Sequence, residues 1–461
     1  MSDRYSRMLA GYAAGVTTIP DSTAHEVKRR ILDSIGVATA AFDADSPTAA
    51  RAYANAFPDA AGASIWNTSR RANPEITSFA NAVAVRYLDF NDTYLSKEPL
   101  HPSDVIPALV AIAEVRNRSP RELLEAIAVA YEIPVTLCDA ASLRAHGWDH
   151  VNYIAIGAAL GAGMLVDLDE QHLEHAVSIA TVPHAAMRQT RAGELSMWKG
   201  AAAANAARNG IFGALLAEAG MTGPNEPFTG EMGLFAQLLD GSGFDDTTLA
   251  GIAAGGAPSR ILDTYIKFWP VEYHAQSAVD AALRLRSEIG SVEIAAIRID
   301  TFRTSYEIIA KDPEKWDPKT RETADHSIQY IVCAALEDGE VTMATFDLDR
   351  IRRPSTLGLL QQRTTVESDD ALTDGYPDGV PNRITVTTAD GVEHVREVRY
   401  PRGHAKNPMT DEEVTRKYRA NVSGRWSDER VGLVAEHVWN LDESTTLEYL
   451  LAQLRTEEAN T

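Results

Sequence analysis

The stretch that decides the fold is an Ala-rich segment, residues 197–219, which reads MWKGAAAANAARNGIFGALLAEA. Alanine is the strongest helix former, and its side chain is short enough to let a neighbouring helix approach closely. Gly220 follows as the expected C-cap, because glycine adopts the left-handed conformation in which many helices end. The segment therefore predicts a core of tightly packed helices.

A second apolar segment, residues 154–166, predicts another closely packed helix. It is the longest apolar run in the chain, and it is shorter than the ~20 residues that a membrane span needs. Its glycines, Gly157, Gly161 and Gly163, do not have the spacing of a dinucleotide-binding loop and follow no predicted strand. We expect them to mark a helix–helix contact instead.

Helix signals continue outward from these two segments. In the first half, helical runs follow capping residues or proline in the ranges 22–42, 74–90, 119–131 and 169–175. The start at 119–122 is the strongest, because it combines a capping serine, a proline at the first helical position and a glutamate in the first turn. Near the C terminus, similar starts are expected at Thr410, Ser427 and Ser444.

Near residue 258 the sequence pattern changes from helical to a mixture of strand and helix signals. Residues 294–302 alternate apolar and polar side chains, as a strand does, and 383–400 forms two β-rich runs joined by Ala389-Asp390-Gly391, the best hairpin signal in the chain. Residues 327–336 between them are predicted to be helical. The segment 366–382 is rich in Asp, Gly and Pro and is expected to be a soft, flexible part of the chain.

These patterns predict an α+β protein. A large all-helical domain is built from both chain ends, residues 1–266 and 401–461, and a smaller α/β lid domain, residues 267–400, is inserted between them. We expect the C-terminal helices to dock back on the first half. Cys138 and Cys333 both lie in apolar runs and are expected to be free thiols in a reducing compartment.

The net charge of the chain limits the classes of partner that can be expected. Lys and Arg number 43 and Asp and Glu 65, which gives a formal net charge of −22. A chain this acidic repels phosphate backbones, so no nucleic acid partner is expected. The N terminus shows no signal-peptide pattern and no membrane span is predicted, so we expect a cytoplasmic protein. Because the chain as a whole is negatively charged, an anionic substrate would need a pocket in which positive charges are concentrated.

Two polar clusters in the first half combine imidazoles with carboxylates. The first is Asp89–Tyr94 followed by His101–Asp104, and the second is His146–His150. A carboxylate beside a histidine can orient an acid/base imidazole. The alternative is that the carboxylates are helix caps or surface charges and that the histidines are solvated loop residues. No metal-binding pattern such as HExxH or CxxC accompanies them, so no metal is predicted.

Three further clusters add cations and hydroxyl groups. Arg188 and Lys199 lie just before or at the start of the Ala-rich helix, where Lys199 could bind a carboxylate, although it could equally be a snorkelling surface lysine. Residues 267–276 gather a lysine, a glutamate, a tyrosine and a histidine at the proposed domain boundary, a preferred place for small ligands. Residues 325–330 end in a tyrosine, for which burial in the core is the alternative.

Taken together, these motifs resemble the MmgE/PrpD family. The matching stretches, in chain order, are Asp89–Thr93 with HPSD at 101–104, GWDH at 147–150, WKG at 198–200, KFWPVEYHAQSAVDAAL at 267–283 and ADHSIQYIVCAAL at 324–336. The resemblance covers nearly the full chain. It implies a large helical domain with a smaller α/β lid, a homodimer, and chemistry that needs neither a metal ion nor an iron–sulfur cluster.

Within this family are 2-methylcitrate dehydratases, cis-aconitate decarboxylases and iminodisuccinate epimerases. The stretches EYHAQSAVDAA, DHSIQY and GWDHV, and the spacing of nine residues between Asp92 and His101, are most similar to the dehydratase branch. The resemblance thus implies a hydro-lyase that removes water from a 2-hydroxytricarboxylate. The product would be cis-2-methylaconitate, formed in propionate catabolism without a cofactor.

The resemblance also implies a set of site residues. The catalytic residues would be Asp89, His101, His150, Lys199, Lys267 and Tyr330, and the substrate-binding residues Asp92, Arg188 and His274. One of the two catalytic histidines would be the base and the other the acid, with Asp89 and Asp92 orienting His101. The two lysines would hold carboxylates, and Tyr330 would bind a carboxylate or relay a proton.

Two alternatives stay open at this point. The first is another activity of the same family, either cis-aconitate decarboxylase or an epimerase or dehydratase of a related polycarboxylate. The second is a non-catalytic protein that only binds a tricarboxylate. In each case the expected partner is a small-molecule tricarboxylate and, through the family, a second copy of the chain.

Overall fold

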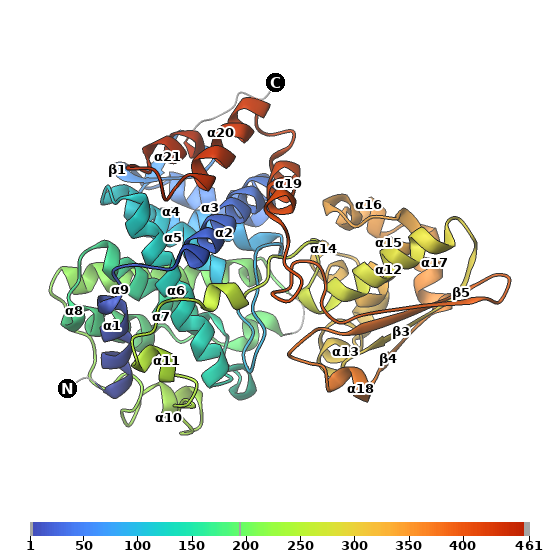
Figure 1. Cartoon of the computed structure of the whole chain (residues 1–461), viewed down its shortest axis with the longest axis horizontal. Coiled ribbons are helices and arrows are strands. Elements are labelled where there is room, and N and C mark those ends of the chain that lie inside the picture. Colours follow the sequence, from blue (N-terminus) through green and yellow to red (C-terminus); the bar gives the residue numbers. More distant parts are fainter. Residues whose placement is uncertain (1–2, 193–194, 456–461) are drawn as a thin grey trace. The chain divides into compact units, whose positions relative to one another are not determined.

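The computed structural model describes residues 3–192 and 195–455. The chain divides into two compact units. Unit 1 combines the two chain ends, residues 1–264 and 410–461, and unit 2 is the inserted segment 265–409. Unit 1 is mainly helical, whereas unit 2 carries a four-stranded sheet, so the protein is an α+β protein with a large helical part (Figure 1).

Helices make up most of unit 1. Its helices are α1 (Arg4–Gly15), α2 (Asp21–Ala40), α3 (Asp45–Asn55), α4 (Pro74–Tyr87), α5 (Ile106–Val115), α6 (Pro120–Ala140), α7 (Val151–Leu165), α8 (Glu170–Thr181), α9 (Trp198–Glu218), α10 (Leu234–Leu238), α11 (Ala250–Ala253), α19 (Asp411–Val422), α20 (Asp428–Trp439) and α21 (Glu448–Leu454). The Ala-rich segment forms α9, and Gly220 follows it with a φ of 88°, as its sequence predicts.

The core of unit 1 is built around α9, which packs against α7, α4 and α8. Glycine makes the closest of these approaches possible. A Cβ on Gly210 of α9 would lie 2.5 Å from the carbonyl oxygen of Ala155 in α7, and one on Gly157 of α7 would lie 2.8 Å from the carbonyl oxygen of Ala130 in α6. The prediction that the glycines of 154–166 mark a helix–helix contact is confirmed.

Replacing Gly210 with alanine is expected to lower the free energy of unfolding by about 1–3 kcal/mol, because the new methyl group overpacks the contact between α9 and α7. Denaturant unfolding followed by circular dichroism measures the change. Gly432→Ala in α20 is the matched control, since a Cβ there meets nothing within 4 Å. A Gly210→Ala protein as stable as this control would contradict the close approach of the two helices.

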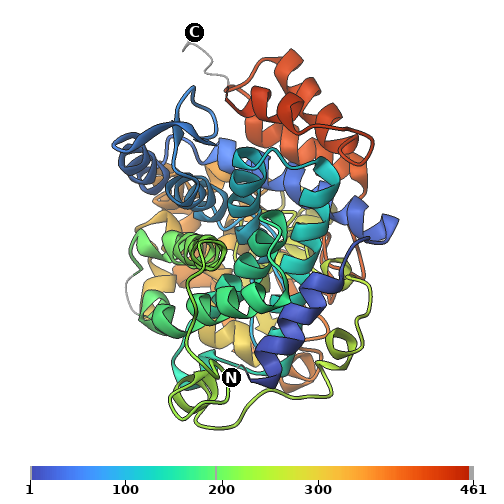
Figure 2. The same ribbon diagram turned by 90° about the vertical axis from the view of Figure 1, so that its left-hand side faces the viewer.

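The C-terminal helices lie against the N-terminal ones. α19 packs on α2, and both views show the red C-terminal helices beside the blue N-terminal region (Figure 2). Thr410 caps α19 in a capping box and Ser427 caps α20, as predicted. The start expected at Ser444 is wrong: α21 begins at Glu448, because Ser444 instead donates its hydroxyl to the Thr446 carbonyl in a turn.

Unit 1 also holds a small antiparallel sheet that sequence patterning does not predict. It pairs β1 (Pro58–Ser64) with β2 (Arg71–Ala72). β1 reads PDAAGAS and contains no β-branched or aromatic residue, so its propensity gives no strand signal. Gly62 permits the pairing, because a Cβ at this position would lie 2.0 Å from the carbonyl oxygen of Ala72.

Unit 2 packs short helices against one mixed sheet. The helices are α12 (Gln276–Ile289), α13 (Arg303–Ile309), α14 (Arg321–Ala324), α15 (Ile328–Asp338), α16 (Leu348–Ile351), α17 (Pro354–Arg363) and α18 (Asp370–Thr373). The strands, β3 (Ile294–Thr301), β4 (Thr364–Ser368), β5 (Asn382–Thr388) and β6 (Glu393–Val398), lie in the order β4-β3-β5-β6. The predicted hairpin is the antiparallel pair β5 and β6.

The segment 366–382 is more ordered than its composition suggests. Its first residues belong to β4, which pairs in parallel with β3, and Asp369 caps α18 directly afterwards. Helices α12 and α15 bury their apolar faces together with β3 and β5 in the core of unit 2. Parallel pairing of β4 with a strand that lies about 70 residues earlier has no local sequence signal, because it depends on this shared core.

Candidate active site

The first site residue lies where α4 ends. Asp89 follows the helix with a φ of 51°, in the left-handed region that non-glycine residues seldom adopt. Its buried carboxylate accepts a short hydrogen bond from the guanidinium of Arg86, one helical turn earlier, which is also buried. The turn and this ion pair together fix the position of the carboxylate.

His101 is held in one tautomer. Its Nδ1 lies 2.7 Å from the backbone carbonyl oxygen of Asp92, and a carbonyl oxygen can only accept a hydrogen bond. Nδ1 must therefore carry a proton, and the exchangeable position of the imidazole is Nε2. This nitrogen faces the Asp89 carboxylate, with 3.9 Å between Nε2 and Oδ1. His101 is thus oriented by the Asp92 backbone, whereas the sequence prediction expected the carboxylate of Asp89 to orient it.

His150 is a neutral imidazole. Nε2 is 3.4 Å from a guanidinium nitrogen of Arg191, and Nδ1 is 3.3 Å from the carboxylate of Asp149. Burial, and after it the positive charge of Arg191, lower the pKa of His150 to about 3. The charge of Arg191 is balanced by Asp149, whose carboxylate it contacts at 3.0 Å.

Lys199 completes the cluster. It is the second residue of α9, and its ammonium is 3.8 Å from the second carboxylate oxygen of Asp89. The rings of His101 and His150 lie 5.9 Å apart between their centroids. Of the predicted catalytic residues, the structure therefore brings Asp89, His101, His150 and Lys199 together in unit 1.

Asp92 lies on the same loop as His101 and is buried next to this cluster. One carboxylate oxygen accepts the backbone N–H of Ser103 at 2.9 Å, the other accepts the Tyr131 hydroxyl at 2.7 Å, and Arg30 lies 3.5 Å away. The carboxylate is fully buried. The predicted substrate-binding role of Asp92 is therefore not supported: the residue holds the loop on which His101 sits.

Asp104 belongs to the same buried layer. One of its oxygens accepts the side-chain amide of Asn91 at 3.1 Å, and burial raises the pKa of its carboxyl to about 7. Near pH 7 this carboxyl is therefore only about half ionised and carries part of a full negative charge. Among the ion pairs of the site, Arg86 and Lys199 both contact the carboxylate of Asp89.

Arg188 begins a short 3-10 turn, Arg188–Arg191, that lies beside His150. Its backbone N–H donates to the Gly147 carbonyl at 3.0 Å, and its side chain is half-buried. Sequence analysis missed Arg86 and Arg191 as members of the site. Arg86 could have been found, because it is a lone charge in the apolar run of α4, whereas Arg191 had only its place beside Arg188 as a signal.

The remaining predicted residues lie in unit 2. Tyr330 is fully buried in the core of that unit, and its hydroxyl donates to the Thr345 carbonyl at 2.6 Å. Burial raises its pKa to about 12. Its surroundings are those of a core residue, and they do not support the predicted catalytic role.

Lys267 and His274 belong to a second polar cluster, which is centred on Glu272 in unit 2. His274 Nδ1 is 2.7 Å from the carboxylate of Glu272, and the ring packs against Phe302. Burial raises the pKa of Glu272, but His274, His326 and Lys267 outweigh it and lower this pKa to about 2. The Glu272 carboxylate is therefore ionised, and its negative charge balances part of the positive charge nearby.

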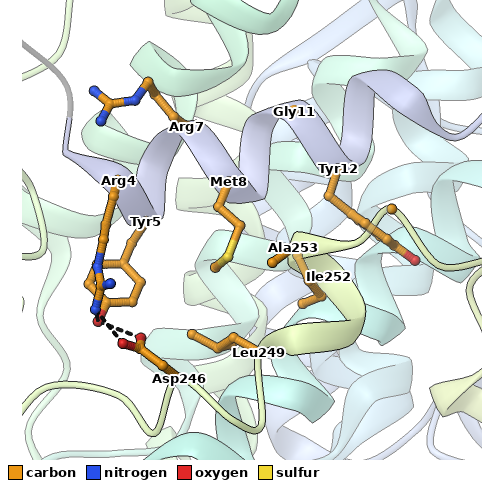
Figure 3. Close-up of a pocket in the computed structure, with 11 residues that line it drawn as sticks. Arg4, Tyr5, Arg7, Met8, Gly11, Tyr12, Asp246, Leu249, Ile252 and Ala253 are labelled. Carbon is orange, nitrogen blue, oxygen red and sulfur yellow. Dashed lines mark hydrogen bonds and ion pairs between the residues drawn. The ribbon is translucent and has the colours of Figure 1, made fainter.

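A separate cavity of about 600 Å³ lies between α1 and α11 (Figure 3). Arg4 and the hydroxyl of Tyr5 both contact the carboxylate of Asp246, at 2.5 and 2.9 Å, and Met8 and Leu249 form apolar walls. Among the residues that the structure describes, no histidine or lysine lines the cavity, and the Asp246 carboxylate is already paired. It therefore lacks the groups for proton transfer that the cluster around His101 provides.

The fold and this cluster define the class of the protein: a mainly helical α+β protein in which two imidazoles lie among the carboxylates of Asp89 and Asp149 and the cations that pair with them. Comparison with known families agrees. Residues 7–247 match the MmgE/PrpD N-terminal domain and residues 269–441 match the MmgE/PrpD C-terminal domain. The chain belongs to the MmgE/PrpD family.

Its relatives include enzymes of two kinds. The chain is 30% identical to a 2-methylcitrate dehydratase of Cupriavidus necator over 406 residues, which is 79% of this chain and 78% of the relative. It is 27% identical to a 2-methylcitrate dehydratase of Escherichia coli over 75% of this chain and 74% of the relative. It is also 27% identical to the cis-aconitate decarboxylase of Homo sapiens, over 96% of this chain and 92% of the relative.

Two further observations concern the described parts of the chain. No helix within residues 3–192 and 195–455 has both the length and the apolar character that crossing a membrane requires. In the same residues, no group of three or more His, Cys, Asp and Glu side chains is arranged to hold a metal ion. That the reaction needs no metal or other cofactor stays a prediction.

Proposed function

We propose that the protein is a hydro-lyase of the 2-methylcitrate dehydratase type, which removes water from a 2-hydroxytricarboxylate by metal-independent acid/base catalysis. The product would be cis-2-methylaconitate, formed in propionate catabolism. The observation that carries the proposal is the geometry of His101, whose Nδ1 is held by the Asp92 carbonyl while Nε2 faces the Asp89 carboxylate, which Arg86 and Lys199 also contact. The dehydratases among the relatives support the choice of reaction.

The reaction begins with removal of the C–H proton next to a carboxylate. His101 Nε2 takes this proton, and the electron pair of the C–H bond moves toward the carboxylate group. The proton is only weakly acidic, so the growing negative charge must be stabilised by fixed cations. We assign this task to Lys199, because its ammonium lies 3.8 Å from the carboxylate of Asp89, which His101 Nε2 also faces.

The second step expels the neighbouring hydroxyl group. The electron pair forms the carbon–carbon double bond, the C–O bond breaks, and the hydroxide leaves as water after receiving a proton. His150 is a poor source of that proton, because its pKa of about 3 keeps the imidazole neutral near pH 7. We therefore assign both transfers to His101, which returns the proton it has taken, and we give His150 the task of binding the leaving group or a carboxylate.

Cis-aconitate decarboxylase is the second candidate. It is favoured by the alignment with the human decarboxylase, which spans 96% of this chain, more than the alignments with the dehydratases described above. The chemistry would use the same groups. Loss of CO₂ leaves an electron pair on carbon that Lys199 can stabilise, and protonated His101 can then supply a proton to that carbon.

A panel of substrates tests the proposal. Purified protein in a chelating buffer is mixed with 2-methylcitrate, citrate and cis-aconitate, and the products are followed by NMR. Loss of water from 2-methylcitrate, unaffected by the chelator, is the expected result. Release of CO₂ from cis-aconitate would replace the dehydratase by the decarboxylase, and calorimetric binding without any product would indicate a non-catalytic tricarboxylate-binding protein.

Two accompanying predictions concern the protein as a whole. The homodimer and the cytoplasmic location follow from the family resemblance and from the sequence. Light scattering after size-exclusion chromatography measures the mass in solution, and a mass near that of a single 50.1 kDa chain would contradict the dimer.

A further inference from the structure

Two arginines, Arg144 and Arg188, lie on neighbouring loops beside His150. The loops are joined by backbone hydrogen bonds: Arg188 N–H donates to the Gly147 carbonyl, and Asp149 N–H donates to the Ala186 carbonyl, each at 3.0 Å. Arg144 begins the 3-10 turn that ends at His146, just before Gly147. Both arginines are therefore held next to the site by two loops that are hydrogen-bonded to each other.

These two guanidinium groups differ from the other arginines of the site. Arg86 and Arg191 each contact a carboxylate, Asp89 and Asp149 respectively. Within the described residues, neither Arg144 nor Arg188 has an ion-pair partner, although both side chains are only half-exposed. Burial and the charge of Arg144 lower the pKa of the Arg188 guanidinium, as expected when two like charges lie close together.

A buried carboxyl group, that of Glu98, acts on both arginines of this pair. One oxygen of Glu98 accepts the Arg144 backbone N–H at 2.8 Å and the Ser142 hydroxyl at 3.0 Å. Burial raises its pKa to about 7. Near neutral pH, Glu98 therefore cancels only part of the positive charge above it, and the pair can still attract an anion.

We propose that Arg144 and Arg188 together bind one carboxylate of the substrate and thereby select tricarboxylates over dicarboxylates. The proposal rests on the proposed function and names the subsite that a third carboxylate occupies. A guanidinium presents a planar fork of donors that matches a carboxylate, and two such forks on the loops that flank His150 would hold one end of the substrate while Lys199 acts near the reacting carbons.

Binding of unreactive acids tests this subsite without requiring turnover. Isothermal titration of the full chain with propane-1,2,3-tricarboxylate and with glutarate measures the selectivity between three and two carboxylates. Arg144→Gln and Arg188→Gln are each expected to weaken tricarboxylate binding by about 10- to 100-fold, since each removes a charge-assisted hydrogen bond. The affinities for the two acids should then become similar.

Arg121→Gln is the matched control, because it removes the same charge from an exposed arginine on α6 that pairs with Glu125. It is expected to leave both affinities unchanged. Arg144→Lys, which keeps the charge but loses the fork, should bind the tricarboxylate better than Arg144→Gln and worse than the wild type. Selectivity that persists in Arg144→Gln, or a lysine variant no better than the glutamine variant, would overturn the proposal.

Glu98 gives an independent readout. The charged or titratable groups that face it are Arg144, Arg188, the Cys138 thiol and the Tyr153 hydroxyl, and burial keeps the pKa of the last two well above neutrality. Ionisation of Glu98 opposes a bound anion, so the Kd of the tricarboxylate should rise about tenfold from pH 6 to pH 8. In Glu98→Gln this rise should be much smaller, and an unchanged rise would count against the subsite.

The outcomes separate this subsite from the reaction itself. If the protein converts none of the polycarboxylates but still binds the tricarboxylate through the two arginines, the proposed hydro-lyase function fails and the subsite stands. If the protein removes water from 2-methylcitrate while Arg144→Gln keeps the wild-type selectivity, the function stands and the subsite fails.

Discussion

Replacing His101 with glutamine is expected to lower kcat by about 10²- to 10⁴-fold, the usual contribution of a positioned acid/base group. Glutamine keeps an N–H that can donate to the Asp92 carbonyl, so the loop should stay in place while the exchangeable nitrogen is lost. Steady-state kinetics with the substrate identified by the NMR panel measures the effect. The KM should change much less than kcat, because the imidazole acts on the reacting proton.

His146→Gln is the matched control. His146 lies in the same part of unit 1, but its imidazole contacts the exposed carboxylate of Asp240 at 2.8 Å, and its loss should leave kcat unchanged. The dependence of kcat/KM on pH separates His101 from His150. Because the pKa of His150 is about 3, His150 should contribute no titration between pH 5 and 9. Turnover of His101→Gln at the wild-type rate would remove His101 from the mechanism.

The helices could be predicted from sequence because their signals are local. The alanines of α9 and the glycines of α7 report how closely neighbouring helices approach, and Ser119 with Glu122 forms the capping box that its spacing predicts. The hairpin of β5 and β6 is equally local, since its turn lies at Asp390-Gly391. Patterns of this kind need only a few consecutive residues.

The elements that sequence analysis missed depend on distant partners. β1 has a composition that predicts no strand, and it pairs with β2 because Gly62 lets the two backbones meet. β4 lies at the start of a segment that was expected to be soft, and its order comes from parallel pairing with β3. Neither pairing leaves a trace in the local pattern of apolar and polar residues.

In the candidate site, too, the sequence predicts some features and misses others. The family motifs identified Asp89, His101, His150 and Lys199, and the structure brings these side chains together. The motifs do not separate a side chain that can meet substrate from one that supports its neighbours. Tyr330 belongs to a matching motif, yet its hydroxyl bonds to a backbone carbonyl in the core.

The supporting groups of the loop come from opposite ends of the chain. Lys417 of α19 donates to the backbone carbonyl of Phe90 at 2.7 Å and lies 2.7 Å from the carboxylate of Asp33 in α2. Its ammonium also sits 3.8 Å above the centroid of the Phe90 ring. Phe90 follows Asp89, so a residue near the C terminus fixes the loop that carries the site carboxylate, and no sequence pattern links positions so far apart.

Replacing Lys417 with methionine is therefore expected to lower the free energy of unfolding by about 3–5 kcal/mol, because it leaves the Asp33 carboxylate buried without its counter-charge. Burial already raises the pKa of Asp33 and Lys417 opposes that rise, so the variant should lose more stability at pH 8 than at pH 5, where Asp33 can take up a proton. Denaturant unfolding at both pH values measures this loss of stability.

Two further variants serve as controls. Lys97→Met, at an exposed pair with Asp245, should have little effect. Asp33→Asn combined with Lys417→Met should recover part of the loss. A loss no larger than that of Lys97→Met would show that the buried pair does not hold the site loop.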